Sequence, residues 1–390
     1  MSRVMNTYAR LHVSLQHGDG CWVTDTDGKI YLDALSGIAV STLGHNHPEL
    51  VAAIAAQAGR LLHSSNIYSM PLQETLADKL TELSGLNEVF FCNSGCEANE
   101  AAIKLSRLHG YQKGIDNPTI IVMEKAFHGR TLATLSATGN RKAQIGFEPL
   151  VTGFVQVPYN DLEAIHTVAA NDKNIVAVMI EIIQGEGGVR AADANYLQAL
   201  NKLCDENGWL LICDEIQCGM GRTGKWFGFQ HADILPDVVT MAKGLGGGVP
   251  VGACIAGGQA TGLFSPGSHG STFGGNQLAM VAALTTIDVV EKEGLVHNAK
   301  AVGALIMNGL EKELSDLQGV VAIRGMGLMI GIELDRPCSE LVTRALDAGL
   351  LINVTADSVI RLLPPLNLNA EEGRELANRL APLIRNFLVA

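Results

Sequence analysis

Short apolar runs separated by helical patterns dominate the middle of the chain. Between residues 88 and 257 the runs are EVFFC, TIIVMEKA, IVAVMIEII, WLLICDE, DVVTMA and GACIAG. They are continuous rather than alternating, which is typical of strands buried on both faces of a parallel sheet. The intervening segment CEANEAAIKLSRLHGY repeats apolar residues every three or four positions and predicts a helix. The pattern therefore predicts an α/β domain around a mostly parallel sheet.

The two ends of the chain follow a different pattern. CWVTDTDGKIYLDALSG alternates around Asp27-Gly28 and predicts a β-hairpin. HNHPELVAAIAAQAGRLLH predicts a helix with Pro48 in its first turn. Another helix is expected from about Gln277, and beyond Val302 strand and helix patterns mix before a final helix. We expect a large α/β domain of residues 51–294 and a smaller α+β domain built from residues 1–50 and 295–390.

Composition narrows the class of protein. The 390 residues carry a net charge of -12 and no run of Lys or Arg, so a nucleic-acid partner is not expected. No apolar run has the length of a membrane span, and the start has no signal-peptide core. The eight cysteines are scattered without a C-x-x-C pair, which favours a reducing cytoplasm. His45 and His47 lack a nearby acidic or thiol partner, so we expect no metal site there.

The stretch FFCNSGCEANEAA places a possible anion site after an apolar run. Ser94 and Glu97 have the spacing of a capping box, so a helix should begin there. Gly95 would let the backbone approach a ligand, and free amides at a helix start favour an anion such as phosphate. An ordinary capped helix accounts for the same residues, and this stretch alone does not decide between the two.

Asp214 and Lys243 also follow apolar runs. A carboxylate in such a place needs a partner, and either a protonated heterocyclic nitrogen or a structural Arg or Lys would serve for Asp214. Lys243 enters the glycine-rich stretch KGLGGG. Burial would lower the pKa of its amine and make it a nucleophile towards a carbonyl, whereas most lysines keep their ammonium in water. The nearby GMGRTG is not a dinucleotide motif, because five residues separate it from the strand and no helical pattern follows.

Taken together, these features resemble the class III (ω-) aminotransferases, which use pyridoxal 5′-phosphate (PLP). The similarity covers almost the whole chain, through SGCEANEAAIK, AFHGRTLATLSATGN, IIQGEGGV, DEIQCGMGRTG, AKGLGGGVPVGA, GSTFGGNQLA and IRLLPPLN in that order. The stretch FHGRTLATLSATGN is similar to the branch that acts on N-acetyl-ornithine. The resemblance implies the fold-type I architecture, with a seven-stranded, mostly parallel sheet flanked by helices and a smaller α+β domain.

The same resemblance implies how the cofactor is held. Lys243 would form the Schiff base and shuttle the proton, and Asp214 would pair with the pyridinium nitrogen. Gln217 would lie near the phenolic oxygen, and Phe127 would stack on the ring. The remaining implied contacts are with the phosphate, from the amides of Gly95 and Cys96 and from Thr272 of a neighbouring subunit, which implies a homodimer with shared sites.

Substrate contacts are implied as well. Arg130 would hold the carboxylate of N-acetyl-ornithine, and Arg361 the α-carboxylate of glutamate or 2-oxoglutarate, each through a bidentate pair. Glu186 would mask Arg361 while the first donor is bound. Ser271 would lie near the substrate. The implied reaction converts N-acetyl-ornithine and 2-oxoglutarate into N-acetyl-glutamate 5-semialdehyde and glutamate, in arginine biosynthesis.

The chain departs from the family pattern in three places. Cys96 stands where a small Ala or Thr is usual, Ile182 where Pro is common, and Cys218 where Thr is commoner. None removes a catalytic group, but Cys96 and Cys218 suggest a site that is sensitive to oxidation. The donor remains open between N-acetyl-ornithine, N-succinyl-ornithine, ornithine and 4-aminobutyrate. An aminomutase or racemase, or a regulator that binds the cofactor without turnover, are further alternatives.

Overall fold

The computed structural model describes residues 3–389, and its largest sheet has seven strands. Their order is β4 (Glu88–Cys92), β12 (Gly252–Ala256), β11 (Val238–Met241), β10 (Leu210–Asp214), β7 (Ile175–Glu181), β5 (Thr119–Met123) and β6 (Phe154–Val157). Only β12 runs antiparallel to its neighbours. The mostly parallel seven-stranded sheet is therefore confirmed. Strand β6 was not predicted, since it is four residues long and only one of them is buried.

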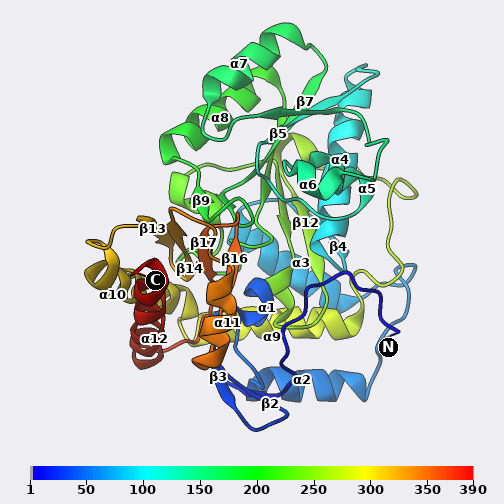
Figure 1. Cartoon of the computed structure of the whole chain (residues 1–390). Helices are drawn as coiled ribbons and strands as arrows, with labels where there is room; N and C mark the ends of the chain where they lie inside the picture. The colour runs from blue at the N-terminus through cyan, green and yellow to red at the C-terminus, as the bar shows by residue number, and fades with distance from the viewer. Residues whose placement is uncertain (1–2, 390) are drawn as a thin grey trace.

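Helices cover both faces of this sheet, which explains why the strand sequences do not alternate. Along β5, Ile120 and Val122 belong to one apolar core, and Ile121 and Met123 belong to another. The first core includes residues of α4 (Gly95–Gln112), and the second includes residues of α3 (Pro71–Ser84), α8 (Ala194–Asn207) and α9 (Gln277–Lys292). Figure 1 shows α4 on one side of the sheet and α7 (Leu162–Asn171) with α8 on the other. Both faces of the sheet are thus shielded from water, and the side chains on both faces are apolar.

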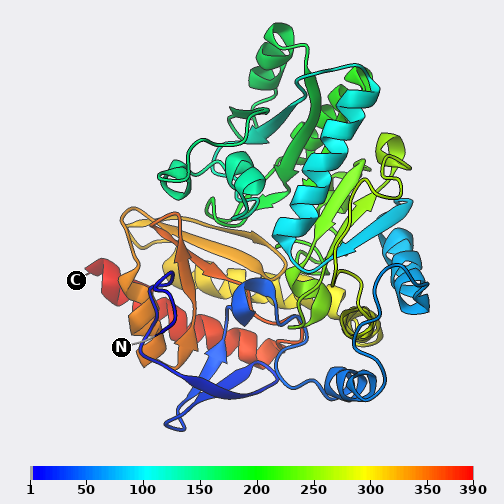
Figure 2. The ribbon, with the colours of Figure 1, turned by 90° about the vertical axis from the view of Figure 1, so that its right-hand side faces the viewer.

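A second body is built from the two ends of the chain. One four-stranded sheet combines β1 (Leu15–Asp19), β2 (Trp22–Asp25) and β3 (Ile30–Asp33) with β15 (Leu350–Leu351). The other joins β13 (Val320–Met326), β14 (Met329–Leu334), β17 (Val359–Leu362) and β16 (Asn353–Thr355). Its helices are α10 (Leu295–Leu314), α11 (Glu340–Asp347) and α12 (Ala370–Val389), while α2 (Pro48–Ala58) begins at its boundary and packs against α9. In Figure 2 the blue N-terminal strands lie beside the orange and red C-terminal elements.

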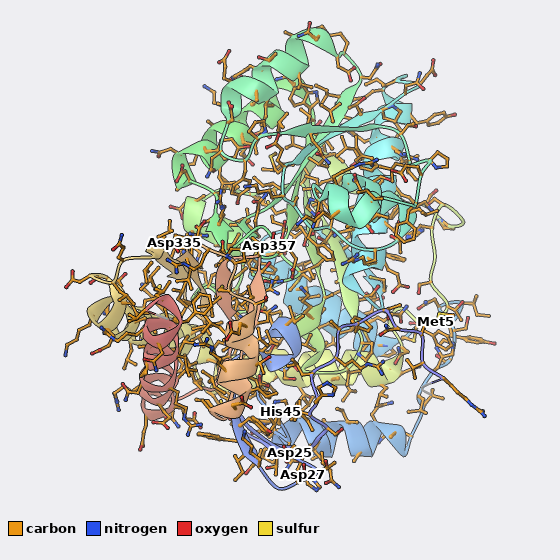
Figure 3. All side chains as sticks on the ribbon, viewed as in Figure 1. Met5, Asp25, Asp27, His45, Asp335 and Asp357 are labelled. Carbon is orange, nitrogen blue, oxygen red and sulfur yellow. The ribbon has the colours of Figure 1, made fainter. Side chains whose placement is uncertain are left out.

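The predicted N-terminal hairpin is present as β2 and β3. Its turn is closed by the Asp25 carboxylate, whose Oδ1 accepts hydrogen bonds from the amides of Asp27 and Lys29, each at 2.9 Å. Gly28 takes a positive φ of 83°, a conformation that glycine adopts without strain. Asp25 and Asp27 mark this turn at the lower edge of the molecule in Figure 3.

The large and small bodies have separate apolar cores. The core of the small body takes residues from Cys21 to Leu50 and from Ala282 to Ile384. The helix α9 contributes to both cores, with Met280 in one and Val289 in the other. We propose a division at residues 50 and 295, since the two cores separate close to these points.

The remaining short elements include α5 (Leu132–Ala137), α6 (Arg141–Gln144) and the strand pair β8 (Ile183–Gln184) and β9 (Arg190–Ala191). Bends and the short 3-10 helix η1 (Gly228–Ala232), not an α-helix, follow GMGRTG, so the rejection of a dinucleotide motif is consistent with the structure. No helix within residues 3–389 combines the length and apolarity needed to span a bilayer. Cys92, Cys204, Cys213 and Cys254 are buried, as the sequence indicated.

Candidate active site

The carboxyl ends of the central strands surround a cavity of about 320 Å³. Six residues singled out in the sequence line it: Gly95, Cys96, Phe127, Asp214, Gln217 and Lys243. Its volume lies within the range of small-molecule sites, and its position is where open α/β sheets bind ligands. The tertiary fold thus brings together side chains spread over about 150 positions of the chain.

Lys243 begins the 3-10 turn η2 (Lys243–Gly246) directly after β11. Its φ of 42° is positive, which is uncommon for a residue with a side chain and is often found at functional sites. Burial lowers the pKa of its amine, and the positive charge of Arg361 lowers it further. A larger fraction of the amine is therefore neutral, which is the form that attacks a carbonyl.

Asp214 is the last residue of β10, and its carboxylate is held by neutral partners and a histidine. Its Oδ2 accepts hydrogen bonds from Asn99 Nδ2 and His128 Nδ1, each at 2.8 Å, and its Oδ1 accepts from the amide of Ile216 at 3.1 Å. No Lys or Arg of the described chain forms an ion pair with it. The structural alternative raised from the sequence therefore fails, and the carboxylate borders the cavity as a hydrogen-bonded anion.

Glu181 and His128 are direct neighbours of Asp214 and also line the cavity, and neither was predicted from the sequence. Glu181 pairs with Asp214 across β7 and β10. Burial raises the pKa of Glu181 to about 7. Burial also works against the charged form of His128, but the hydrogen bond to Asp214 and the charges of Asp214 and Glu181 together outweigh it, and the pKa of His128 is raised. Glu181 accepts a hydrogen bond from the amide of Phe127 at 2.9 Å, so it fixes the loop that carries that ring.

The start of α4 forms an anion cradle at one end of the cavity. Ser94 is the N-cap, and its Oγ accepts from the amide of Glu97 at 3.3 Å. The Glu97 carboxylate reaches back to the amide of Asn93 at 2.9 Å, one residue earlier than a standard capping box requires. Gly95 leaves no room for a side chain, because an added Cβ would lie 2.8 Å from Ile216. Gly95 and Cys96 line the cavity, so the first amides of the helix, which lack intrahelical acceptors, lie at its edge.

Arg361 and Glu186 meet beside this cavity. The buried guanidinium donates from Nη1 to Glu186 Oε1 at 2.7 Å and to Gln217 Oε1 at 3.1 Å. Its Nε donates to Asn353 Oδ1 at 3.2 Å, and its Nη2 is buried without a partner in the described chain. Burial works to raise the pKa of Glu186, but the charge and hydrogen bond of Arg361, with smaller contributions from Lys243 and Thr355, together outweigh it, and the pKa is lowered. One guanidinium nitrogen thus remains available to a further acceptor.

Besides Arg361 and Glu186, three more of the predicted residues lie outside the cavity wall of their own chain. Arg130 is exposed, with its guanidinium carbon 5.6 Å from the centre of the Phe127 ring. Ser271 and Thr272 lie in the loop before α9. Ser271 Oγ accepts a hydrogen bond from Asn93 at 3.2 Å, so this loop comes close to the anion cradle without entering it.

Comparison with known proteins decides the family. Residues 4–384 match the family model described as "Aminotransferase class-III". The chain belongs to the class-III aminotransferase family. It is 59% identical, over 100% of its length and 99% of the relative, to acetylornithine aminotransferase of Nitrosomonas europaea. It is 48% identical, over 96% and 94% respectively, to the enzyme of the same name from Methanocaldococcus jannaschii.

Solved structures of aminotransferases have the same fold. The ornithine aminotransferase of Toxoplasma gondii superposes with a TM-score of 0.95 and 32% identity, over 99% of this chain and 93% of that one. The acetylornithine aminotransferase of Elizabethkingia anophelis superposes with a TM-score of 0.88 and 34% identity, over 99% and 97%. This aminotransferase is a PLP-dependent transaminase of fold-type I.

The residues that line this cavity match the chemical groups of PLP. Lys243 would supply an amine for the aldehyde, the start of α4 would supply amides for the phosphate, and Asp214 would supply a carboxylate for a protonated ring nitrogen. Phe127 borders the same cavity as a flat apolar wall. Gly129 leaves the cradle open, since an added Cβ would lie 2.8 Å from Cys96 Sγ.

The sequence contained signals for the residues it failed to predict. Glu181 ends the apolar run IVAVMIE, so the rule that selected Asp214 selects it too. His128 follows Phe127 in a motif that had already been recognised. Asn99 lies one helical turn after Gly95, on the side that faces Asp214, and only the packing of α4 on β10 reveals this role.

Proposed function

We propose that this transaminase moves the terminal amino group of N-acetyl-ornithine to 2-oxoglutarate, giving N-acetyl-glutamate 5-semialdehyde and glutamate in arginine biosynthesis. The observation that carries the proposal is the Glu186–Arg361 ion pair beside Lys243. The relatives that bear the name acetylornithine aminotransferase, at 47–59% identity, support the choice of donor.

The pair addresses a physical problem of selectivity. The amine of N-acetyl-ornithine is remote from its carboxylate, whereas the carbonyl of 2-oxoglutarate is next to one. An unmasked Arg361 would attract a carboxylate beside the reacting carbon in both half-reactions. With Glu186 in place this charge is neutralised, and Arg130, exposed over the Phe127 ring, would hold the remote carboxylate of the donor. Movement of Glu186 would then open Arg361 for 2-oxoglutarate.

The remaining residues would act on the cofactor and on protons. When bound, PLP supplies the electron sink that allows an amino group to leave one carbon and join another. The Nζ atom of Lys243 would hold the cofactor through its aldehyde. As a free amine, the same atom would move the proton between the amine-bearing carbon of the donor and the aldehyde carbon of the cofactor. Asp214 would hold the proton on the ring nitrogen, and Gln217 would face the phenolic oxygen. Phe127 would cover one ring face and exclude water.

We also propose a homodimer with shared sites. Ser271 and Thr272 do not line the cavity of their own chain, and large apolar side chains beside their loop face solvent. Phe273 is 60% exposed, Ile67 81% and Tyr68 64%. Asn66 ties the two segments together through bonds to the carbonyls of Ser271 and Gly274. Thr272 would contact the cofactor phosphate of the partner.

With eight free cysteines in residues 3–389, we place the enzyme in the cytoplasm.

Half-reactions test the donor directly. The purified holoenzyme would be mixed with one donor at a time, N-acetyl-ornithine first, then N-succinyl-ornithine, ornithine and 4-aminobutyrate. We expect N-acetyl-ornithine to bleach the visible absorbance of the bound cofactor fastest and 2-oxoglutarate to restore it with formation of glutamate. Faster bleaching by another donor would replace the substrate. Intact absorbance that no donor bleaches would instead favour an aminomutase or a regulator.

A further inference from the structure

A short segment of the small body, residues 34–42, lies between the two cations of the site. On one side the Ser36 hydroxyl donates to the carbonyl of Leu363 at 2.6 Å, and the amide of Leu363 donates to the carbonyl of Ala34 at 2.8 Å. Leu363 follows the strand that carries Arg361. On the other side the Thr42 hydroxyl donates to the carbonyl of Gly244 at 2.9 Å, next to Lys243. We call residues 34–42 the bridging segment.

The bridging segment has an unusual backbone. Ser36, Gly37, Ile38 and Ala39 all have positive φ, at 47°, 65°, 67° and 61°, so the chain makes one left-handed turn there. Such a turn is unfavourable for residues with side chains, above all for a β-branched one such as Ile38. It persists only where the surroundings impose it, and such backbone clusters at functional sites. Asp33 holds its start, since Oδ1 accepts from the amides of Leu35 and Ser36 at 2.9 and 2.8 Å.

The contact between Thr42 and Gly244 is close and buried. Thr42 is 1% exposed. An added Cβ on Gly244 would lie 2.6 Å from Thr42 Oγ1, so the glycine permits an approach that other residues would prevent. The amide of Leu366 donates to the Thr42 carbonyl at 2.9 Å, which fixes Thr42 to the chain that follows Arg361. Thr42 is therefore held on the small body and bonds directly to the turn that carries Lys243.

We propose that Thr42 is a positioning residue for the reaction. Its hydroxyl fixes the Gly244 carbonyl and thereby holds Lys243 in its positive-φ conformation, with the amine towards the cofactor. Because Thr42 is anchored beside the strand of Arg361, the geometry of the lysine depends on the docking of the small body. The inference rests on the transaminase chemistry of the family, and it is independent of which donor is used.

Three variants of the holoenzyme test the role. Thr42→Val keeps the volume but removes the hydroxyl, Thr42→Ser keeps the hydroxyl, and Thr286→Val is the matched control. Thr286 is also fully buried and lies against the same loop, since a Cβ on Gly247 would meet its Oγ1 at 2.7 Å. Its hydroxyl, however, bonds to Ala282 in its own helix. The first readout, without any donor, is the pH at which the visible absorbance of the bound cofactor changes. The second is the single-turnover rate with whichever donor bleaches the wild type.

The expected pattern separates positioning from mere stability. Thr42→Val should shift the midpoint of the absorbance change and lower the single-turnover rate by about fivefold, the scale of one lost hydrogen bond. Thr42→Ser should restore both, and Thr286→Val should leave both at wild-type values even if its melting temperature falls. Wild-type absorbance and rate in a folded Thr42→Val would overturn the proposal. Equal defects in Thr42→Val and Thr42→Ser would also overturn it, because the methyl group rather than the hydroxyl would then matter.

Discussion

Glu186 and Arg361 form an ion pair of 2.7 Å in which the arginine side chain is fully buried and the glutamate side chain is 37% exposed. The asymmetry indicates which partner moves. Arg361 is also held by Gln217 and Asn353, whereas within residues 3–389 the Glu186 carboxylate has only Thr355, at 3.3 Å, as a further side-chain partner. Glu186 lies on the solvent side and can turn outward, but only as a substrate carboxylate takes its place, because an arginine left buried without a counter-charge is strongly disfavoured.

Replacing Glu186→Ala should therefore reduce selectivity rather than abolish turnover. With Arg361 unmasked, we expect the half-reaction with glutamate to gain on the half-reaction with N-acetyl-ornithine by about tenfold, the scale of a charge-assisted hydrogen bond. Stopped-flow absorbance of each half-reaction measures this ratio. Glu375→Ala, which breaks the Arg379–Glu375 pair on α12, is the control. An unchanged ratio in Glu186→Ala would mean that the carboxylate does not mask Arg361.

Lys243→Ala should have no measurable transamination, since no other amine lines the cavity within the described chain. The variant is expected to retain cofactor through the amides at the start of α4 and through Asp214. Turnover would be followed as glutamate formed from 2-oxoglutarate. Sustained turnover by a homogeneous Lys243→Ala preparation would remove Lys243 from the mechanism.

The lowered pKa of Lys243 leads to a prediction about stability in the cofactor-free protein. Unfolded, the amine titrates near 10.5, and folded it titrates lower because burial disfavours the charge. Between these two pKa values the unfolded state binds one more proton than the folded state. The free energy of unfolding therefore increases as the pH rises through this range. Lys243→Met should thus be more stable than the wild type at neutral pH. Its advantage should shrink as the pH rises towards 10.5, as denaturant titrations at several pH values would measure, and a constant advantage would contradict this account.

Asp214→Asn should keep the fold but lose most of the rate. The amide retains the shape of the carboxylate but removes the negative charge that faces the cofactor ring. We expect kcat to fall by about 10²–10³-fold, the range seen when one preorganised electrostatic partner is removed. Asp237→Asn serves as a control, because Asp237 is also buried but bonds to the amides of Leu211 and Gln259, away from the cavity. Equal losses in both variants would indicate a structural effect.

Oxidation should act through Cys96 and not through Cys218. Cys96 is half-buried and borders the cavity. Cys218 is buried with its sulfur 3.0 Å from Glu215, and burial raises its pKa, so its thiol stays protonated and shielded. Mild peroxide should therefore inactivate cofactor-free wild type and Cys218→Ala alike, and it should spare Cys96→Ala. Activity that survives peroxide in the wild type would count against a redox-sensitive site.

Subunit mixing tests the proposed dimer. Lys243→Ala removes the amine of its own site, and Thr272→Val would weaken phosphate binding at the site of the partner. In a mixed dimer, one chain carries Lys243→Ala and the other carries Thr272→Val. If Thr272 contacts the site of its partner, both defects fall on the site of the Lys243→Ala chain, and the other site is intact. One intact site per mixed dimer should result, with wild-type affinity for PLP. If the site that keeps Lys243 shows weakened PLP affinity instead, Thr272 acts in its own chain; if the Thr272→Val homodimer already binds PLP with wild-type affinity, Thr272 has no role.

The strand and helix patterns of this chain could be predicted because burial on two faces produces a continuous run of apolar residues in the sequence. Ile120 to Met123 are apolar in succession since alternate residues enter different cores, and Ser94 marks the start of α4 by its own hydrogen bond. Strand β6 has no such run, because a half-exposed strand of four residues is compatible with many sequences.

The sequence by itself determined the family, the cofactor and six of the residues that line the cavity, because the types and order of its motifs reflect the chemistry they perform. Only the tertiary structure decided what those residues contact. Asp214 has Asn99 and His128 as partners instead of a cation, Glu186 covers Arg361, and Thr42 meets Gly244. These pairs are separated by 86 to 202 positions, and no local pattern of polarity specifies which distant side chain will complete a buried hydrogen bond.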